Sequence, residues 1–203
     1  MTSAMHDKAS WLSEAAPEEL RRIVDALYRA HRLVSAITDL DVLLERILEE
    51  SKQVAQAEAC SLLLYDHVTD ELYFRIALGE SGDLQTLKDE IRLKLGQGIA
   101  GAAAATRESV NVTDVSADKR FYQFADERSN FQTRNLLAVP LVDRDELVGV
   151  IEVLNKLGGP HFTTMDLHVM EMFSGLTATA LANARLIEEN LRAERLAALG
   201  QAV

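Results

Sequence analysis

Residues 147–156 read Leu-Val-Gly-Val-Ile-Glu-Val-Leu-Asn-Lys, a nearly continuous apolar run that ends in two polar residues. A second apolar run, Leu136–Val142, precedes it, and the polar segment Asp143–Glu146 separates the two. Short apolar runs bounded by polar turn residues are typical of β-strands, and so short a connection joins two strands in antiparallel order. We therefore expect a hairpin over residues 136–154.

Three further strand patterns lie upstream of this hairpin. Ser61–Tyr65 and Leu72–Leu78 are apolar runs on either side of a turn at His67–Asp70. Ile91–Leu95 alternates strictly between apolar and basic residues, which is the pattern of a half-buried strand. The sequence thus predicts an antiparallel sheet.

Helical periodicity flanks the strands on both sides. Pro17, Glu18 and Glu19 begin the first helix, because proline suits a first turn and acidic side chains oppose the helix dipole. The apolar residues of this helix follow alternating steps of four and three, the spacing of a coiled-coil seam: Ile23, Leu27, Ala30, Val34 and Ile37. A second helix carries its apolar residues on one side: Leu43, Leu44, Ile47, Leu48 and Val54.

The last helix begins after Gly158-Gly159-Pro160, with Thr163 or Thr164 as its cap, and continues toward the end of the sequence. At about forty residues it is longer than one small domain can cover. The surplus should pack against a partner chain. We therefore expect a homodimer through the two flanking helices, in parallel or antiparallel order.

The composition is that of a soluble globular protein, with 48% hydrophobic and 26% charged residues. The formal net charge of −11 disfavours binding to nucleic acid or to anionic lipid. No apolar stretch is long enough to span a membrane, and the N-terminus lacks the apolar core of a signal peptide. Because the single cysteine, Cys60, forms no internal disulfide, we expect a cytoplasmic location.

The segment Gly96–Gly101 satisfies the pattern G-x-G-x-x-G and leads into an alanine-rich turn of helix. This pattern also occurs in dinucleotide-binding folds, where it precedes a crossover helix between parallel strands. Here at most two helical turns fit before Val110–Val112, which is too short for such a crossover. The glycines therefore indicate a tight strand-to-helix turn whose first N–H groups are suited to binding an anion.

No catalytic or metal-binding pattern stands out in the sequence. The five histidines lack the spacing of metal ligands, and no cysteine or paired acid completes a site around them: His6, His31, His67, His161 and His168. We find no nucleophile elbow, phosphate loop or metal-hydrolase motif. We therefore expect a regulatory segment with no catalytic residue and no metal.

Several short motifs, in order, carry a resemblance to a known family. They are Cys60–Leu64, Gly96–Gly101, Phe121-Tyr122, Phe131–Asn135, Pro140, Gly149–Lys156, Phe162 and Asp166. Over residues 41–187 the chain resembles the GAF domains of cyclic-nucleotide phosphodiesterases and bacterial adenylyl cyclases. It departs from the family pattern N-K…F-x-x-x-D-E only at the last position, where Leu167 stands. The resemblance implies an α+β fold: a GAF-type antiparallel sheet with helices packed on it, flanked by coiled-coil helices.

The resemblance also implies a ligand site. Ligand-binding GAF domains hold a purine cyclic nucleotide between the sheet and a helix-loop lid, here about Asp114–Asn135. The corresponding positions are Ser61, Ile99, Ala100, Tyr122, Asp126, Thr133 and Glu152. Asp126 and Ser61 would bind a base edge, and Thr133 a ring nitrogen or the phosphate. Ile99 and Ala100 would offer backbone N–H groups.

The resemblance includes one departure at the ligand site and one group of structural residues. Where relatives that bind cyclic GMP stack the base on an aromatic residue followed by aspartate, this chain has Ala77 and Leu78. Cyclic AMP and cyclic GMP therefore both stay open as ligands, and no cofactor is required. A second group is implied to be structural, with Lys156 and Asp166 forming a tie: Asn155, Lys156, Phe162 and Asp166.

The C-terminal residues 192–202 are similar to the helix that enters the dimerisation and phosphoacceptor region of sensor histidine kinases. The chain is thus expected to comprise a flexible tail (1–16), an N-terminal dimerisation helix (17–38), a GAF sensor domain (39–187) and a linker helix (188–203) toward an output domain. Two alternatives stay open: a ligand-free GAF domain for dimerisation and signal relay, and a haem or redox sensor.

Overall fold

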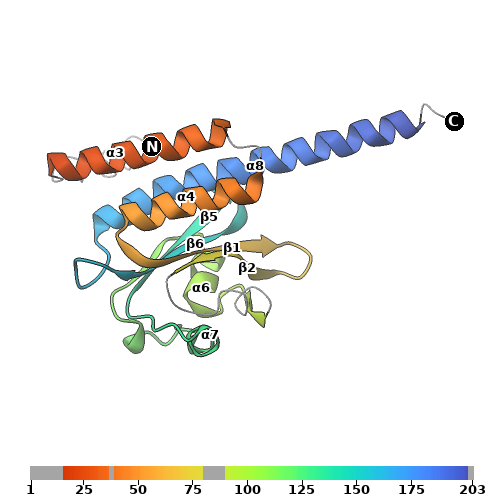
Figure 1. Ribbon diagram of the computed structural model, residues 1–203. Helices are drawn as coiled ribbons and strands as arrows, with labels where there is room; N and C mark the ends of the chain where they lie inside the picture. The colour runs from red at the N-terminus through yellow and green to blue at the C-terminus, as the bar shows by residue number, and fades with distance from the viewer. Residues whose placement is uncertain (1–15, 37–38, 80–89, 201–203) are drawn as a thin grey trace.

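The computed structural model describes residues 16–36, 39–79 and 90–200 (Figure 1). A six-stranded sheet lies at its centre, with the strands in the order β3-β2-β1-β6-β5-β4 and every neighbouring pair antiparallel. The strands are β1 (Ala57–Asp66), β2 (Glu71–Leu78), β3 (Arg92–Lys94), β4 (Val110–Val112), β5 (Leu136–Asp143) and β6 (Glu146–Lys156). The predicted α+β class and antiparallel sheet are confirmed.

Both predicted hairpins are present. The β5–β6 turn places Arg144 and Asp145 at positive φ, as a tight two-residue hairpin turn requires. Gly149 on β6 lies so close to β1 that an added Cβ would be 2.2 Å from the carbonyl oxygen of Leu63. A side chain at this position would push apart the two central strands.

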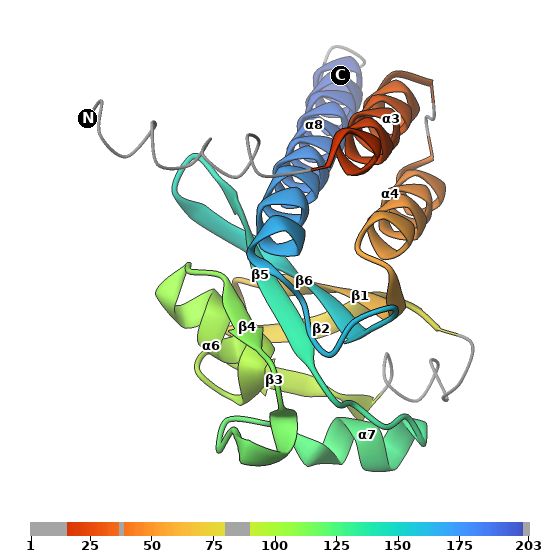
Figure 2. The same cartoon turned by 90° about the vertical axis from the view of Figure 1, so that its left-hand side faces the viewer.

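Helices cover both faces of the sheet. Figure 1 shows α3 (Pro17–Ala36), α4 (Leu40–Val54) and α8 (Thr164–Gly200) on one side of it. Figure 2 shows α6 (Gly98–Thr106) and α7 (Gln123–Ser129) on the other side. A single 3₁₀ turn, η1 (Val115–Ala117), precedes α7. The apolar side predicted for α4 is confirmed, since all five of its named residues are buried: Leu43, Leu44, Ile47, Leu48 and Val54.

The seam on α3 packs against its own chain. Ile23 and Ala30 are buried within the single chain, in a cluster with apolar residues of α4 and α8 that includes Ile47 and Phe173. These two side chains therefore contact their own chain and have little surface left for a partner, and a homodimer through the flanking helices stays a prediction. Leu27 and Val34 lie partly buried against the same cluster; Ile37 lies outside the described residues.

The α8 helix extends past the sheet, as its predicted length requires (Figure 1). Its start is a capping box: Thr163 Oγ1 accepts from the N–H of Asp166, and Asp166 Oδ2 accepts from the N–H of Thr163. Beyond Leu181 the helix exposes three large apolar side chains, Leu186, Ile187 and Leu191. In the described part of the chain, no helix combines the length and the apolar character needed to cross a membrane.

Candidate functional site

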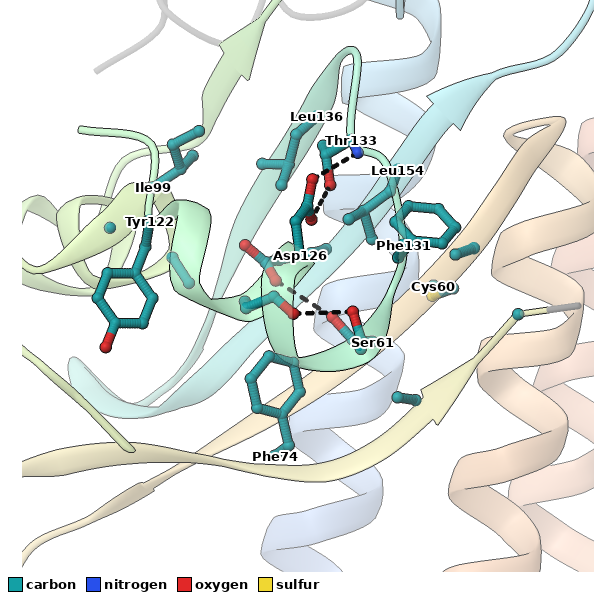
Figure 3. Close-up of a pocket in the computed structure, with 18 of the residues that line it drawn as sticks. Cys60, Ser61, Phe74, Ile99, Tyr122, Asp126, Phe131, Thr133, Leu136 and Leu154 are labelled. Atoms are coloured by element: carbon teal, nitrogen blue, oxygen red, sulfur yellow. Dashed lines mark hydrogen bonds between the residues drawn. The ribbon is translucent and has the colours of Figure 1, made fainter. Parts of the chain in front are cut away.

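The seven residues implied by the resemblance all line one cavity of about 90 Å³ between the sheet and the helices α6 and α7 (Figure 3). They come from four separate parts of the chain: β1, the start of α6, the α7 region and β6. The remaining walls are mostly apolar, and the described residues that line the cavity include no lysine or arginine.

Ser61 and Glu152 form the polar part of the cavity floor. They face each other in the β1–β6 register, and Ser61 Oγ donates a hydrogen bond of 3.1 Å to Glu152 Oε2. The Glu152 side chain is buried, with 7% of the residue exposed. Its burial raises the pKa of Glu152 to about 7, the Ser61 hydrogen bond lowers it, and the charge of Asp126 raises it.

Asp126 and Thr133 differ from the roles expected for them. Asp126 Oδ2 accepts from the backbone N–H of Thr133, and Asp126 Oδ1 accepts from Thr133 Oγ1, both at 2.7 Å (Figure 3). The two residues therefore bind each other across the lid and hold α7 against the loop that follows it. In this conformation neither side chain presents these groups to a base or a phosphate.

The start of α6 is built by glycines. Gly98 has a φ of +73°, and a Cβ on Gly101 would lie 2.6 Å from the carbonyl oxygen of Lys94, so both positions require glycine. The N-cap residue Gln97 makes no side-chain cap, because its Oε1 accepts from the N–H of Lys94. A helix start without a side-chain cap leaves its first N–H groups, among them those of Ile99 and Ala100, for another acceptor.

Aromatic residues supply walls that sequence reasoning missed. Phe74 and Phe131 both line the cavity, together with the aliphatic Leu136 and Leu154. The two-residue period of β2 does predict that Phe74 shares a face with Leu72, but nothing in the sequence shows which face holds the cavity. Ala77 and Leu78 also line the cavity, so an aromatic surface comes from other positions.

Tyr122 lines the cavity only with part of its side chain. Its ring lies 5.8 Å from that of Phe124, centroid to centroid, and in Figure 3 it points away from Ser61. Its β-carbon lies close to Gly98, where an added Cβ would come within 3.3 Å of it. Tyr122 thus closes the cavity against the start of α6.

The implied structural tie is present. Lys156 Nζ lies 2.7 Å from Asp166 Oδ1, with 9% and 8% of the two side chains exposed, and also donates to the carbonyl oxygen of Ala55. The Lys156 ammonium lies 5.9 Å from the ring centroid of Phe162, itself fully buried. This group joins the end of β6 to the start of α8.

The neighbouring Asn155 joins β6 to the lid. Its Oδ1 accepts from the N–H of Arg134 at 2.7 Å, and its Nδ2 donates to the carbonyl oxygen of Gln132 at 2.8 Å. Asn155 has a φ of 58°, a left-handed conformation that asparagine tolerates better than most residues. Two consecutive residues of β6 therefore contact the end of the lid and the start of α8.

The sequence model of the GAF domain matches residues 39–181. The chain belongs to the GAF domain family. GAF domains are regulatory small-molecule-binding domains of signalling proteins, and the described cavity lies within the matched region of this one.

Relatives of this GAF domain include two cyclic-nucleotide phosphodiesterases. The chain is 28% identical over 172 residues to the probable 3′,5′-cyclic phosphodiesterase pde-5 of Caenorhabditis elegans, covering 82% of the chain and 24% of that protein. It is 31% identical over 143 residues to the cone cGMP-specific 3′,5′-cyclic phosphodiesterase subunit alpha′ of Mus musculus, covering 67% of the chain and 17% of that protein. The chain thus spans a quarter or less of the length of these relatives.

Solved structures share the fold of this GAF domain. The GAF domain of a phosphoenolpyruvate-protein phosphotransferase from Coxiella burnetii superposes with a TM-score of 0.73 at 20% identity, over 83% of this chain and 98% of that one. The free methionine-R-sulfoxide reductase of Neisseria meningitidis gives a TM-score of 0.69 at 20% identity, over 85% and 95% of the two chains. The same fold therefore occurs in regulatory domains and in an enzyme.

Proposed function

We propose that this GAF domain is a sensor that binds a purine cyclic nucleotide in the described cavity and passes the signal through α8 to an output domain. The observation that carries the proposal is the convergence of all seven implied ligand positions, from four parts of the chain, on one cavity. The two phosphodiesterase relatives support the choice of ligand class. A histidine kinase is one such output domain.

The size of the cavity indicates what binding requires. Sites for small molecules typically measure about 300–1,000 Å³, whereas this cavity measures about 90 Å³. The lid must therefore move outward to admit a nucleotide. Because the Asp126–Thr133 hydrogen bonds lie within the lid, α7 and the following loop are able to move as one unit. Closed and open lids then provide the two states between which a ligand shifts the population.

The chemistry of the cavity suits a nucleotide with a single negative charge. The N–H groups at the start of α6 are the available donors for a cyclic phosphate, and the partial positive charge of a helix start favours an anion. Phe74 and Phe131 offer apolar faces on which a base can stack. Ser61 and Glu152 lie on the floor, where Ser61 donates to Glu152 Oε2 and the second carboxyl oxygen, Oε1, is the group we assign to the base edge.

Calorimetry of nucleotide-free protein with cyclic AMP and cyclic GMP tests this proposal. We expect saturable heat with at least one of them. Thr133→Ala and Asp126→Ala should each weaken binding by about 1–3 kcal/mol, because each removes hydrogen bonds that keep α7 and the following loop in one piece when the lid closes over a ligand. Ser116→Ala, at an exposed position in η1, is the matched control. Absence of heat with both nucleotides at millimolar concentration would favour a ligand-free relay domain instead.

The burial of the single cysteine, Cys60, favours a regulatory role over thiol-based catalysis. Thiol-based reduction of a sulfoxide needs a reactive thiolate and a second thiol to complete a disulfide. Cys60 is the single cysteine of the sequence; it is buried, and this burial raises the pKa of its thiol. This chain therefore shares its fold with the sulfoxide reductase but lacks the reactive thiolate and the second thiol that such a reaction needs. The same burial disfavours redox sensing at Cys60.

Dimerisation is proposed through the overhanging part of α8. Leu186, Ile187 and Leu191 are about half exposed or more, whereas the seam of α3 is occupied within the chain. Exposed apolar side chains along one helix are the usual means by which two such helices associate. Association of two chains there would bring two output domains together.

A further inference from the structure

Glu152 is the most unusual group in the cavity. It stands at the centre of the sheet between Ser61 of β1 and Ala138 of β5, and one of its two oxygens accepts from Ser61. Among the described residues, Ser61 is the one hydrogen-bond donor to this carboxyl group, and Glu152 lines the cavity, where a ligand can reach it. Burial with one such donor disfavours the charged form of the group.

Among the described residues, the charged groups around Glu152 do not compensate for its burial either. The lid faces it with the carboxylate of Asp126, while the phenol of Tyr122 points away, and β1 contributes the neutral thiol of Cys60. The residues of α6 and β5 that line the cavity are Gly98, Ile99, Ala100 and Leu136, none of which is titratable. The surroundings thus favour the neutral acid, in agreement with the raised pKa of Glu152, about 7.

A neutral carboxylic acid and a carboxylate recognise different base edges. The neutral acid offers one O–H donor beside one acceptor, whereas the carboxylate offers acceptors alone. Adenine presents a donor beside an acceptor, its amino group next to N1 or N7. The N1–H and amino groups of guanine present two neighbouring donors, which suit a carboxylate. Adenine pairing in two hydrogen bonds therefore requires the protonated acid.

The apolar walls act in the same direction. Guanine carries one more exocyclic polar group than adenine, and each such group that is buried without a partner weakens binding. Two polar side chains of the lid, Asp126 and Thr133, bind each other, and the Ser129 hydroxyl donates to the carbonyl oxygen of Ala125. Few groups thus remain to satisfy the additional donors of guanine.

Building on the proposed function, we propose that Glu152 binds the ligand as a protonated acid that pairs with the donor–acceptor edge of an adenine base, so that cyclic AMP binding takes up a proton. Guanine is able to pair with either form of the side chain. Raising the pH until Glu152 loses its proton therefore weakens the binding of cyclic AMP. The loss of this proton does not weaken the binding of cyclic GMP.

Calorimetric titration of the full chain with cyclic AMP and with cyclic GMP at several pH values between 6 and 8.5 tests the inference. Cyclic AMP affinity should fall about thirtyfold over this range if one group with a pKa near 7 must be protonated. Repeating the titration at pH 8 in buffers of different ionisation enthalpy should show uptake of close to one proton. Glu152→Gln, which keeps a donor and an acceptor but does not titrate, should bind cyclic AMP with constant affinity and no proton uptake. Glu146→Gln, exposed on the same strand, is the control that should behave as wild type.

The outcomes separate this inference from the function on which it rests. Binding of cyclic AMP with no pH dependence and no proton uptake overturns the role of Glu152, as does a pH dependence that persists in Glu152→Gln. Either result leaves a nucleotide sensor in place. Binding of cyclic GMP alone, at every pH, also overturns the inference and leaves the sensor. Binding of neither nucleotide overturns the proposed function and the inference together.

Discussion

The two faces of the sheet are built in opposite ways. The face under α4 and α8 is filled by large apolar side chains such as Leu48, Ile151 and Phe162, and its buried ion pair is fully partnered. The face under α6 and α7 meets a helix of glycines and alanines, and the residues enclosed there include Ser61 and Glu152. Figure 2 shows the helices that cover each face, α4 and α8 on one side and α6 and α7 on the other.

This difference separates stability from binding within one sheet. Large interdigitating side chains maximise the apolar area buried, whereas small side chains leave a space and polar groups in it are incompletely satisfied. Every strand contributes alternate residues to each face, so one set of strands supports both tasks. Substitutions on the α4–α8 face should therefore lower stability. Those of polar residues on the α6–α7 face should change ligand binding, and should raise stability where a poorly satisfied group is removed.

The largest expected effect is the loss of the buried ion pair. Asp166→Ala should lower the free energy of unfolding by about 3–5 kcal/mol, because it leaves the buried ammonium of Lys156 without an anionic partner. Urea denaturation measures this change in the free energy of unfolding. Glu49→Ala is the matched control: Arg46 and Glu49 lie at the same 2.7 Å but are exposed, so about 0–1 kcal/mol is expected. Equal effects of the two variants would contradict the stabilising role of the α4–α8 face.

A smaller change in the free energy of unfolding, this time a stabilisation, is expected when Glu152 is replaced. Between its ordinary pKa of 4.5 and its raised pKa of about 7, the folded chain holds a proton that the unfolded chain releases. The free energy of unfolding should therefore fall as the pH rises through this window and stay low above it. Glu152→Gln removes this loss, so it should stabilise the protein at pH 8 by on the order of 3 kcal/mol and have little effect below pH 4.5.

Denaturation of Glu152→Gln and wild type at pH 5, 6, 7 and 8 checks this prediction. The difference between the two proteins should grow from pH 5 to pH 7 and level off by pH 8. Glu146→Gln, exposed on the same strand, should show no such trend. If Glu152→Gln destabilises the chain at pH 8, the side chain is satisfied as a carboxylate and the contrast between the two faces is weaker than described.

The smallest effect on stability is expected on the overhang of α8, which belongs to neither face. Ile187→Asp combined with Leu191→Asp should change the free energy of unfolding by less than about 0.5 kcal/mol, because both side chains are exposed within the chain. The double variant should nevertheless sediment as a monomer in analytical ultracentrifugation where wild type sediments as a dimer. Val68→Asp, in the β1–β2 turn and 94% exposed, is the control. A wild-type monomer at tens of micromolar, a practical order of magnitude for weak helical association, would refute the dimer.

The sequence predicted those parts of the fold that depend on local pattern. The two hairpins, the apolar side of α4 and the long α8 follow from periodicity and turn residues alone. The family resemblance then identified seven residues that line the cavity and, apart from them, the Lys156–Asp166 tie. These features could be predicted because each depends on residues that are close in the sequence or on a motif shared with the family.

The remainder depends on contacts between distant segments. The four-three spacing of Ile23 and Ala30 describes a helix with one apolar stripe, but it does not distinguish a partner chain from the chain's own α4 and α8. Likewise, no pattern shows that Asp126 accepts hydrogen bonds from Thr133, seven residues away, in place of a ligand. In both cases a partner within the same chain binds or buries a side chain that the sequence pattern assigned to a partner chain or a ligand.

The position of the ion pair at the very start of α8 has a mechanical consequence. Asn155 and Lys156 are adjacent, so a displacement of the lid reaches the base of α8 through a single peptide unit. Beyond Leu181, where its core contacts end, α8 extends for about 30 Å at 1.5 Å per residue. The helix is thus a lever whose far tip moves by about 5 Å, nearly one helical pitch, for a tilt of about 10° at the edge of the domain.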